Sequence, residues 1–133
     1  MSQIQDLHQQ AMDLAELAFT AKLRGDLERA DLLFRQAFEK EASAATLIAS
    51  DLNAEPTRSV LHRSAASLAV DCGEFQAADR LIATALSGNP PQEIADELKD
   101  LFIRINLRRY FERRGITFDE EKLNSLILEK QLG

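Results

Sequence analysis

The residues with the clearest capacity for chemistry are the arginines of RINLRRYFERR, residues 104–114. This stretch holds five arginines and one glutamate, a net charge of +4, which leaves −10 for the rest of a chain of net charge −6. On a helix, part of this set shares one arc and forms a basic strip that could meet nucleic acid or an acidic partner. The same side chains could instead contact the acidic remainder of the chain or a second subunit, or face solvent near a helix C-terminus. The strip consists of Arg104, Arg108, Arg109 and Arg113.

The remaining reactive residue types give little indication of catalysis. His8 and His62 are far apart and lack the spacing of a metal pair, so we expect both at the surface or at its boundary. Cys72 precedes Gly73 at an expected helix C-terminus, where the helix dipole disfavours a thiolate, and we expect it to pack in the core. The chain has no glycine-rich phosphate loop and no Ser-His-Asp candidate. We therefore predict no catalytic residue, no metal site, no cofactor and no enzymatic activity.

Composition sets the broad class of the protein. The 133 residues are 45% apolar, enough for one domain over residues 1–133 with its own core. One cysteine excludes an internal disulfide and fits a reducing compartment. No signal peptide and no long apolar run is visible, so we expect a soluble, cytoplasmic protein that does not enter the membrane. The acidic balance makes nucleic acid an improbable partner for most of the surface.

Few glycines and prolines, abundant alanine and leucine, and apolar residues spaced by three and four predict an all-α fold. The spacing predicts an antiparallel hairpin over about 2–52, whose second helix runs to about Leu52, and another over about 57–88. Two further helices follow over about 91–131, the last opened by a capping box at Thr117 and Glu120. We expect about six helices, as a superhelix or a compact bundle.

Two segments of the chain copy each other. GDLERADLLFRQAF, starting at Gly25, aligns without a gap with GEFQAADRLIATAL, starting at Gly73. Upstream of both, small residues recur where paired helices would cross, because alanine lets two helix axes approach to about 8 Å. These crossing residues are Ala18, Ala21, Ala66 and Ala69.

This repeated pattern resembles the tetratricopeptide repeat, a helix hairpin with small residues at the crossing and glycine at the turn. EPTRSVLHRSAASLAVDCGEF and NPPQEIADEL are also similar to short bacterial proteins of this type. Such repeats recur every 34 residues or so, whereas Gly25 and Gly73 are 48 apart. Ala42 stands where a proline would end the second helix, so the first hairpin should have longer arms.

The resemblance implies a protein-binding adaptor in which the first helix of each hairpin lines a groove for a peptide or a partner helix. In that groove Lys22 and Arg63 could bind a carboxylate, although Arg63 could instead pair with a nearby acid of the same chain. By position, the implied groove residues are Met12, Ala15, Phe19, Lys22, Val60, Arg63, Ser67 and Val70.

Two other functions stay open at this point. The last two helices carry unpaired apolar residues that could fold back over the bundle or pair with a twin chain, which would make the protein a homodimeric scaffold. The basic strip would instead serve a nucleic-acid-associated protein.

Overall fold

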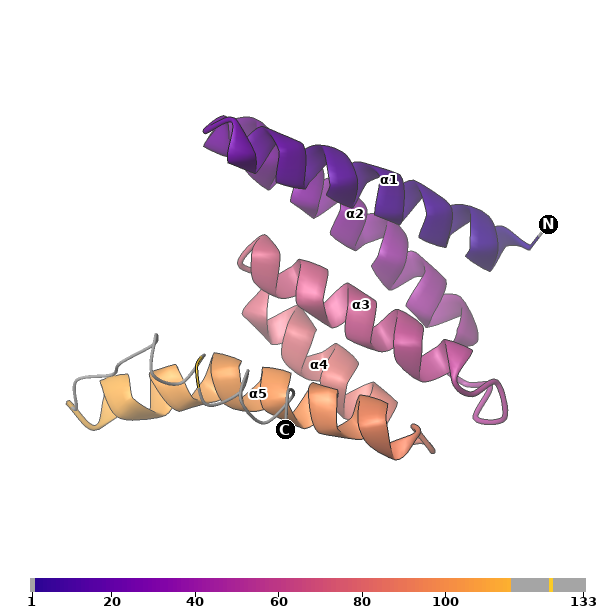
Figure 1. The fold of residues 1–133 in the computed structure, drawn as a ribbon. Helices are drawn as coiled ribbons and strands as arrows, with labels where there is room; N and C mark the ends of the chain where they lie inside the picture. The colour runs from indigo at the N-terminus through magenta and orange to yellow at the C-terminus, as the bar shows by residue number, and fades with distance from the viewer. Residues whose placement is uncertain (1, 116–124, 126–133) are drawn as a thin grey trace.

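A computed structural model describes residues 2–115 and residue 125. Within these residues the chain forms five α-helices and no β-strand, which confirms the all-α prediction. The helices are α1 (Gln3–Leu23), α2 (Leu27–Ile48), α3 (Thr57–Asp71), α4 (Phe75–Leu86) and α5 (Gln92–Arg113). Figure 1 shows α1 and α2 as one antiparallel hairpin, α3 and α4 as a second hairpin beside it, and α5 against the second hairpin.

The copied sequence segments begin at the two hairpin turns. Gly25 and Gly73 have φ values of +82° and +80°, a left-handed conformation that glycine adopts without steric cost. After the first turn the side chain of Asp26 accepts a hydrogen bond from the Arg29 backbone N–H at 3.2 Å and so caps α2. Ser2 and Gln5 form a capping box at the start of α1. The two copies of the sequence repeat therefore begin at two helix–helix turns of the same kind.

Alanines occupy the places where the helices of each hairpin cross. Ala18 and Ala21 of α1 and Ala66 and Ala69 of α3 are between 0% and 6% exposed. A methyl side chain at such a position lets neighbouring helices approach closely, and a larger one would push them apart. The predicted crossing positions are thus buried, as the sequence pattern required.

The prediction that the second helix reaches Leu52 is wrong, because α2 ends at Ile48. The Asp51 backbone N–H donates to the Ile48 carbonyl at 3.0 Å, within a turn that replaces the helix. Nε of Arg58, on α3, donates to the Ala49 carbonyl at 2.7 Å. A contact from the next helix thus takes an acceptor that a further turn of α2 would have used. The arms of the first hairpin are nevertheless the longer ones, with 21 and 22 residues in α1 and α2 against 15 and 12 in α3 and α4.

Helix α5 packs on the second hairpin as far as Asn106. Ile94, Leu98 and Ile105 are buried in a cluster shared with α3 and α4. Nδ2 of Asn106 donates to the Asp79 side chain of α4 and to the Phe102 carbonyl, both at 3.0 Å. Beyond this point α5 continues past the turn between α3 and α4 (Figure 1).

The predicted sixth helix, with its capping box at Thr117 and Glu120, lies outside the described residues. The choice between its folding back and its pairing with a twin chain therefore stays a prediction.

Candidate partner-binding face

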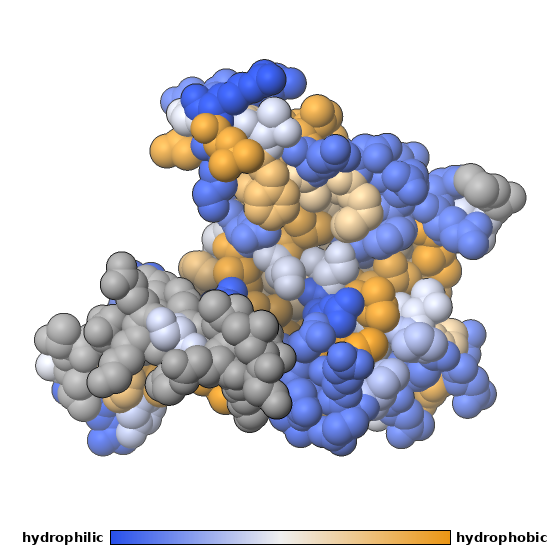
Figure 2. Space-filling view, in the orientation of Figure 1, coloured by the Kyte–Doolittle hydropathy of each residue, from blue (hydrophilic) through white to orange (hydrophobic). Residues whose placement is uncertain are grey.

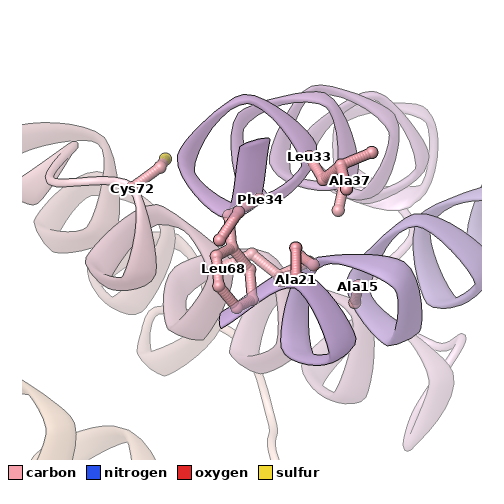
Figure 3. Close-up of a cluster of buried hydrophobic side chains, with 9 residues drawn as sticks. Ala15, Ala21, Leu33, Phe34, Ala37, Leu68 and Cys72 are labelled. Carbon is pink, nitrogen blue, oxygen red and sulfur yellow. The ribbon is translucent and has the colours of Figure 1, made fainter. Parts of the chain in front are cut away.

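The face between α1 and α3 lies over an apolar cluster at the junction of α1, α2 and α3. Figure 3 shows Phe34 of α2 close to Leu68 of α3 and Ala21 of α1, all members of this cluster. Cys72, at the end of α3, is buried in the same cluster. Because close-packed interiors hold their side chains in fixed rotamers, this cluster is a rigid base for the side chains that lie on it.

Phe19 of α1 is a large apolar side chain that contacts this cluster through Phe34 and is partly open to solvent. It is 52% exposed, and its ring meets that of Phe34 edge to face, with centroids 5.0 Å apart and planes at 87°. Figure 2 shows an apolar surface over the region between α1 and α3, bordered by hydrophilic side chains. An aromatic ring held on one side and open on the other is suited to anchor a partner.

The other residues that the resemblance implied on α1 and α3 divide into two groups. Met12 is half-buried against the same cluster as Phe34, Ala15 is part of it, and Lys22 and Ser67 are exposed. Val60 and Val70, by contrast, are half-buried against the cluster that α3 shares with α4 and α5. Helix α5 contacts α3 on this side, and the predicted groove between the first and third helices did not include it.

Arg63 is engaged within the chain. Its Nη1 lies 2.6 Å from Oε2 of Glu97 on α5, and both side chains are about one-third exposed. This pair connects α3 to α5 and satisfies the guanidinium with a carboxylate of the same molecule. Arg63 was expected either to bind a carboxylate of a partner or to pair with an acid of the same chain, and the structure shows the pairing.

Asp71 joins the charged groups at the end of α3. Loss of hydration among its neighbours raises the pKa of this carboxyl, while the positive charges of Lys22 on α1 and Arg104 on α5 act to lower it. Charges from α1 and α5 thus both act on this carboxyl of α3. Asp71 was not among the residues predicted from the sequence, although it follows Arg63 and Ser67 in the helical spacing i, i+4, i+8.

Part of the predicted basic strip borders a pocket of about 300 Å³ between α5 and the α3–α4 turn. We call this hollow the arginine pocket. Its apolar lining comes from Val70, Phe75 and Ile105, and its charged lining from Arg104, Arg108, Arg109 and Glu112. Nε of Arg108 lies 3.4 Å from Oε1 of Glu112, one turn further along α5. Phe75 was not predicted as a site residue, because it follows the α3–α4 turn and the arginines are on a different helix.

Arg113 does not line the arginine pocket. It borders a second hollow on α5 together with Phe102, Ile103 and Tyr110, whose side chains are exposed. The four arginines of the predicted strip therefore do not share one pocket. The predicted pairing of the C-terminal helices with a twin chain would use this side of α5, and it stays a prediction.

The expectation that both histidines lie at or near the surface is wrong for His62. This side chain is buried in α3, and its Nδ1 lies 2.7 Å from the Arg58 carbonyl. Burial is the main cause that lowers the pKa of His62. His8 is half-buried, and its Nδ1 lies 2.9 Å and 3.0 Å from the two carboxylate oxygens of Glu41 on α2. Both imidazoles therefore serve contacts inside the molecule.

Comparisons with known proteins add no relative. No family model, curated protein or solved structure matches the chain. No described helix combines the length and the apolar character needed to cross a membrane. Among the described residues, no three His, Cys, Asp or Glu side chains gather as a metal site would require.

Proposed function

We propose that this chain is a protein-binding adaptor similar to a tetratricopeptide-repeat protein. It holds a peptide or a helix of its partner on the face between α1 and α3, with α5 as a further wall. The observation that carries the proposal is the exposed Phe19 ring, which rests on Phe34 above the junction of three helices. Aromatic residues in such positions often supply most of the affinity of an interface.

The proposal includes no chemical step on the partner. The two imidazoles are occupied by Glu41 and by the Arg58 carbonyl. Burial raises the pKa of the Cys72 thiol, which works against a reactive thiolate. The two imidazoles and the thiol, groups that often act as bases and nucleophiles in proteins, thus make structural contacts here. Binding of a partner explains the exposed face between α1 and α3 better than catalysis.

We expect Phe19→Ser to weaken peptide binding by at least about tenfold, because it removes a central apolar anchor. The full chain is used to select peptides from a displayed random library, and the affinity of each selected peptide is measured by isothermal titration calorimetry. Leu32→Ser is the matched control, since Leu32 on α2 is an apolar side chain of similar exposure. The control should change the affinity by less than about twofold, and circular dichroism checks that both variants fold.

Equal losses in the two variants, or no loss in Phe19→Ser, would rule out the face between α1 and α3 as the binding surface.

A further inference from the structure

The arginine pocket carries positive charge on an acidic protein. Three arginines and one glutamate line it, a balance of 3 − 1 = +2, whereas the whole chain has a net charge of −6. Of the pocket's arginines, Arg104 also acts on the Asp71 carboxyl, together with Lys22 of α1. The electrostatic potential in the pocket therefore favours a negatively charged ligand. Charge complementarity of this kind affects which partner binds more than how tightly the partner binds.

The pocket also offers apolar surface beside its cations. Phe75 is 45% exposed at the first position of α4, next to Val70 and the buried Ile105. A ligand that fills this pocket must bring an apolar group and an anionic group within a few ångströms of each other. Peptides in which a large apolar residue is flanked by aspartate or glutamate have this property.

Nucleic acid fits the same surroundings less well. A phosphate backbone calls for a continuous basic track, but Glu112 lines the pocket and Asp71 directly follows the lining residue Val70 on α3. These carboxylates repel phosphates, while a peptide can place its own backbone N–H groups near them. The mixed lining therefore favours a peptide.

We propose that the arginine pocket binds an acidic segment of the partner, in which an apolar side chain lies on Val70, Phe75 and Ile105 and a flanking carboxylate lies at Arg104. This inference rests on the proposed function, because the pocket and the face share the end of α3: Val70 lines the pocket, and the next residue, Asp71, feels the charges of both Arg104 and Lys22. It adds the chemistry of the partner: acidic, with an apolar residue at its centre.

The test uses a fluorescein-labelled hexapeptide of alternating glutamate and leucine, and its counterpart with glutamine in place of glutamate. Fluorescence anisotropy with the full chain should show the glutamate peptide binding at least about tenfold more tightly at low salt. Arg104→Glu should reduce its affinity by at least about tenfold. Arg80→Glu is the matched control, because it makes the same charge change at an exposed site on α4 away from the pocket. Arg104→Lys, which keeps the charge, should retain most of the binding.

Three results would overturn the inference. The first is equal binding of the glutamine peptide, and the second is an equal loss in Arg80→Glu, which would indicate a response to overall charge. The third is a single-stranded oligonucleotide that binds more tightly than the peptide and depends equally on Arg104.

Failure of the pocket inference is distinguishable from failure of the proposed function. Selected peptides that need Phe19 but not Arg104 refute the pocket alone, and peptides that need Arg104 but not Phe19 refute the face alone.

Discussion

Replacing Arg58 by alanine is expected to lower the free energy of unfolding by about 3 to 5 kcal/mol, the cost typical of breaking a buried charged network. Arg58 is 1% exposed. Its guanidinium donates to the Ala49 carbonyl at 2.7 Å, to Thr84 at 2.9 Å and to Ala85 at 3.4 Å. It therefore satisfies the last carbonyls of two helices, α2 and α4, from a position on a third.

Alanine at position 58 would remove the side-chain donor of the Ala49 carbonyl and one donor each from the Thr84 and Ala85 carbonyls. It would also leave the Glu55 carboxylate without the positive charge that lies 3.9 Å away. The site has no spare volume, since a Cβ added at Gly88 would lie 2.5 Å from Nη1 of Arg58. Urea unfolding followed by circular dichroism measures the change, with Arg80→Ala as the exposed control that should stay within about 0.5 kcal/mol of the parent. A loss below about 1 kcal/mol in Arg58→Ala would mean that the buried guanidinium is not what joins the three helices.

The second large effect is expected at His8. Glu41 is fully buried, and both of its oxygens lie within 3.0 Å of the His8 imidazole. His8→Ala should cost about 2 kcal/mol, below the full cost of breaking a buried pair because His8 itself is partly exposed and water can take its place.

A double-mutant cycle with Glu41→Leu isolates this interaction. If the buried carboxylate is what makes His8 necessary, His8→Ala should cost little once Glu41 is leucine, with a coupling energy of at least about 1 kcal/mol. Urea unfolding of the four proteins provides the measurement. Additive effects of the two substitutions would show that Glu41 does not depend on His8.

Much of the architecture could be predicted from local chemistry. Gly25 and Gly73 mark turns because only glycine adopts positive φ without cost, and the alanines at 18, 21, 66 and 69 mark crossings because small residues recur at the same places before both turns. The end of α2 could not be found in this way. It depends on Arg58, nine residues after Ala49, and a bond across that distance leaves no periodic trace.

The candidate site could be predicted from the sequence only in part, because it too depends on contacts between residues that are far apart in the chain. Phe19 follows from helical position, since it lies on the side of α1 that also carries Met12 and Lys22. The partner of Arg63, however, lies 34 residues away on α5, and the arginine pocket exists because α5 passes beyond the α3–α4 turn. Counting charges found the arginines, but only the packing of α5 shows that Arg104 and Arg108 line the arginine pocket, that Arg113 lines the other hollow, and that Arg109 borders both.

The most direct test of the adaptor proposal is an amide NMR map of the full chain titrated with a peptide selected for binding. The proposal predicts that the largest shifts fall on α1 around Phe19 and Lys22 and on α3 around Ser67 and Asp71, with the outer side of α2 around Leu32 unchanged. Shifts confined to α2, or to the side of α5 around Phe102 and Tyr110, would contradict it.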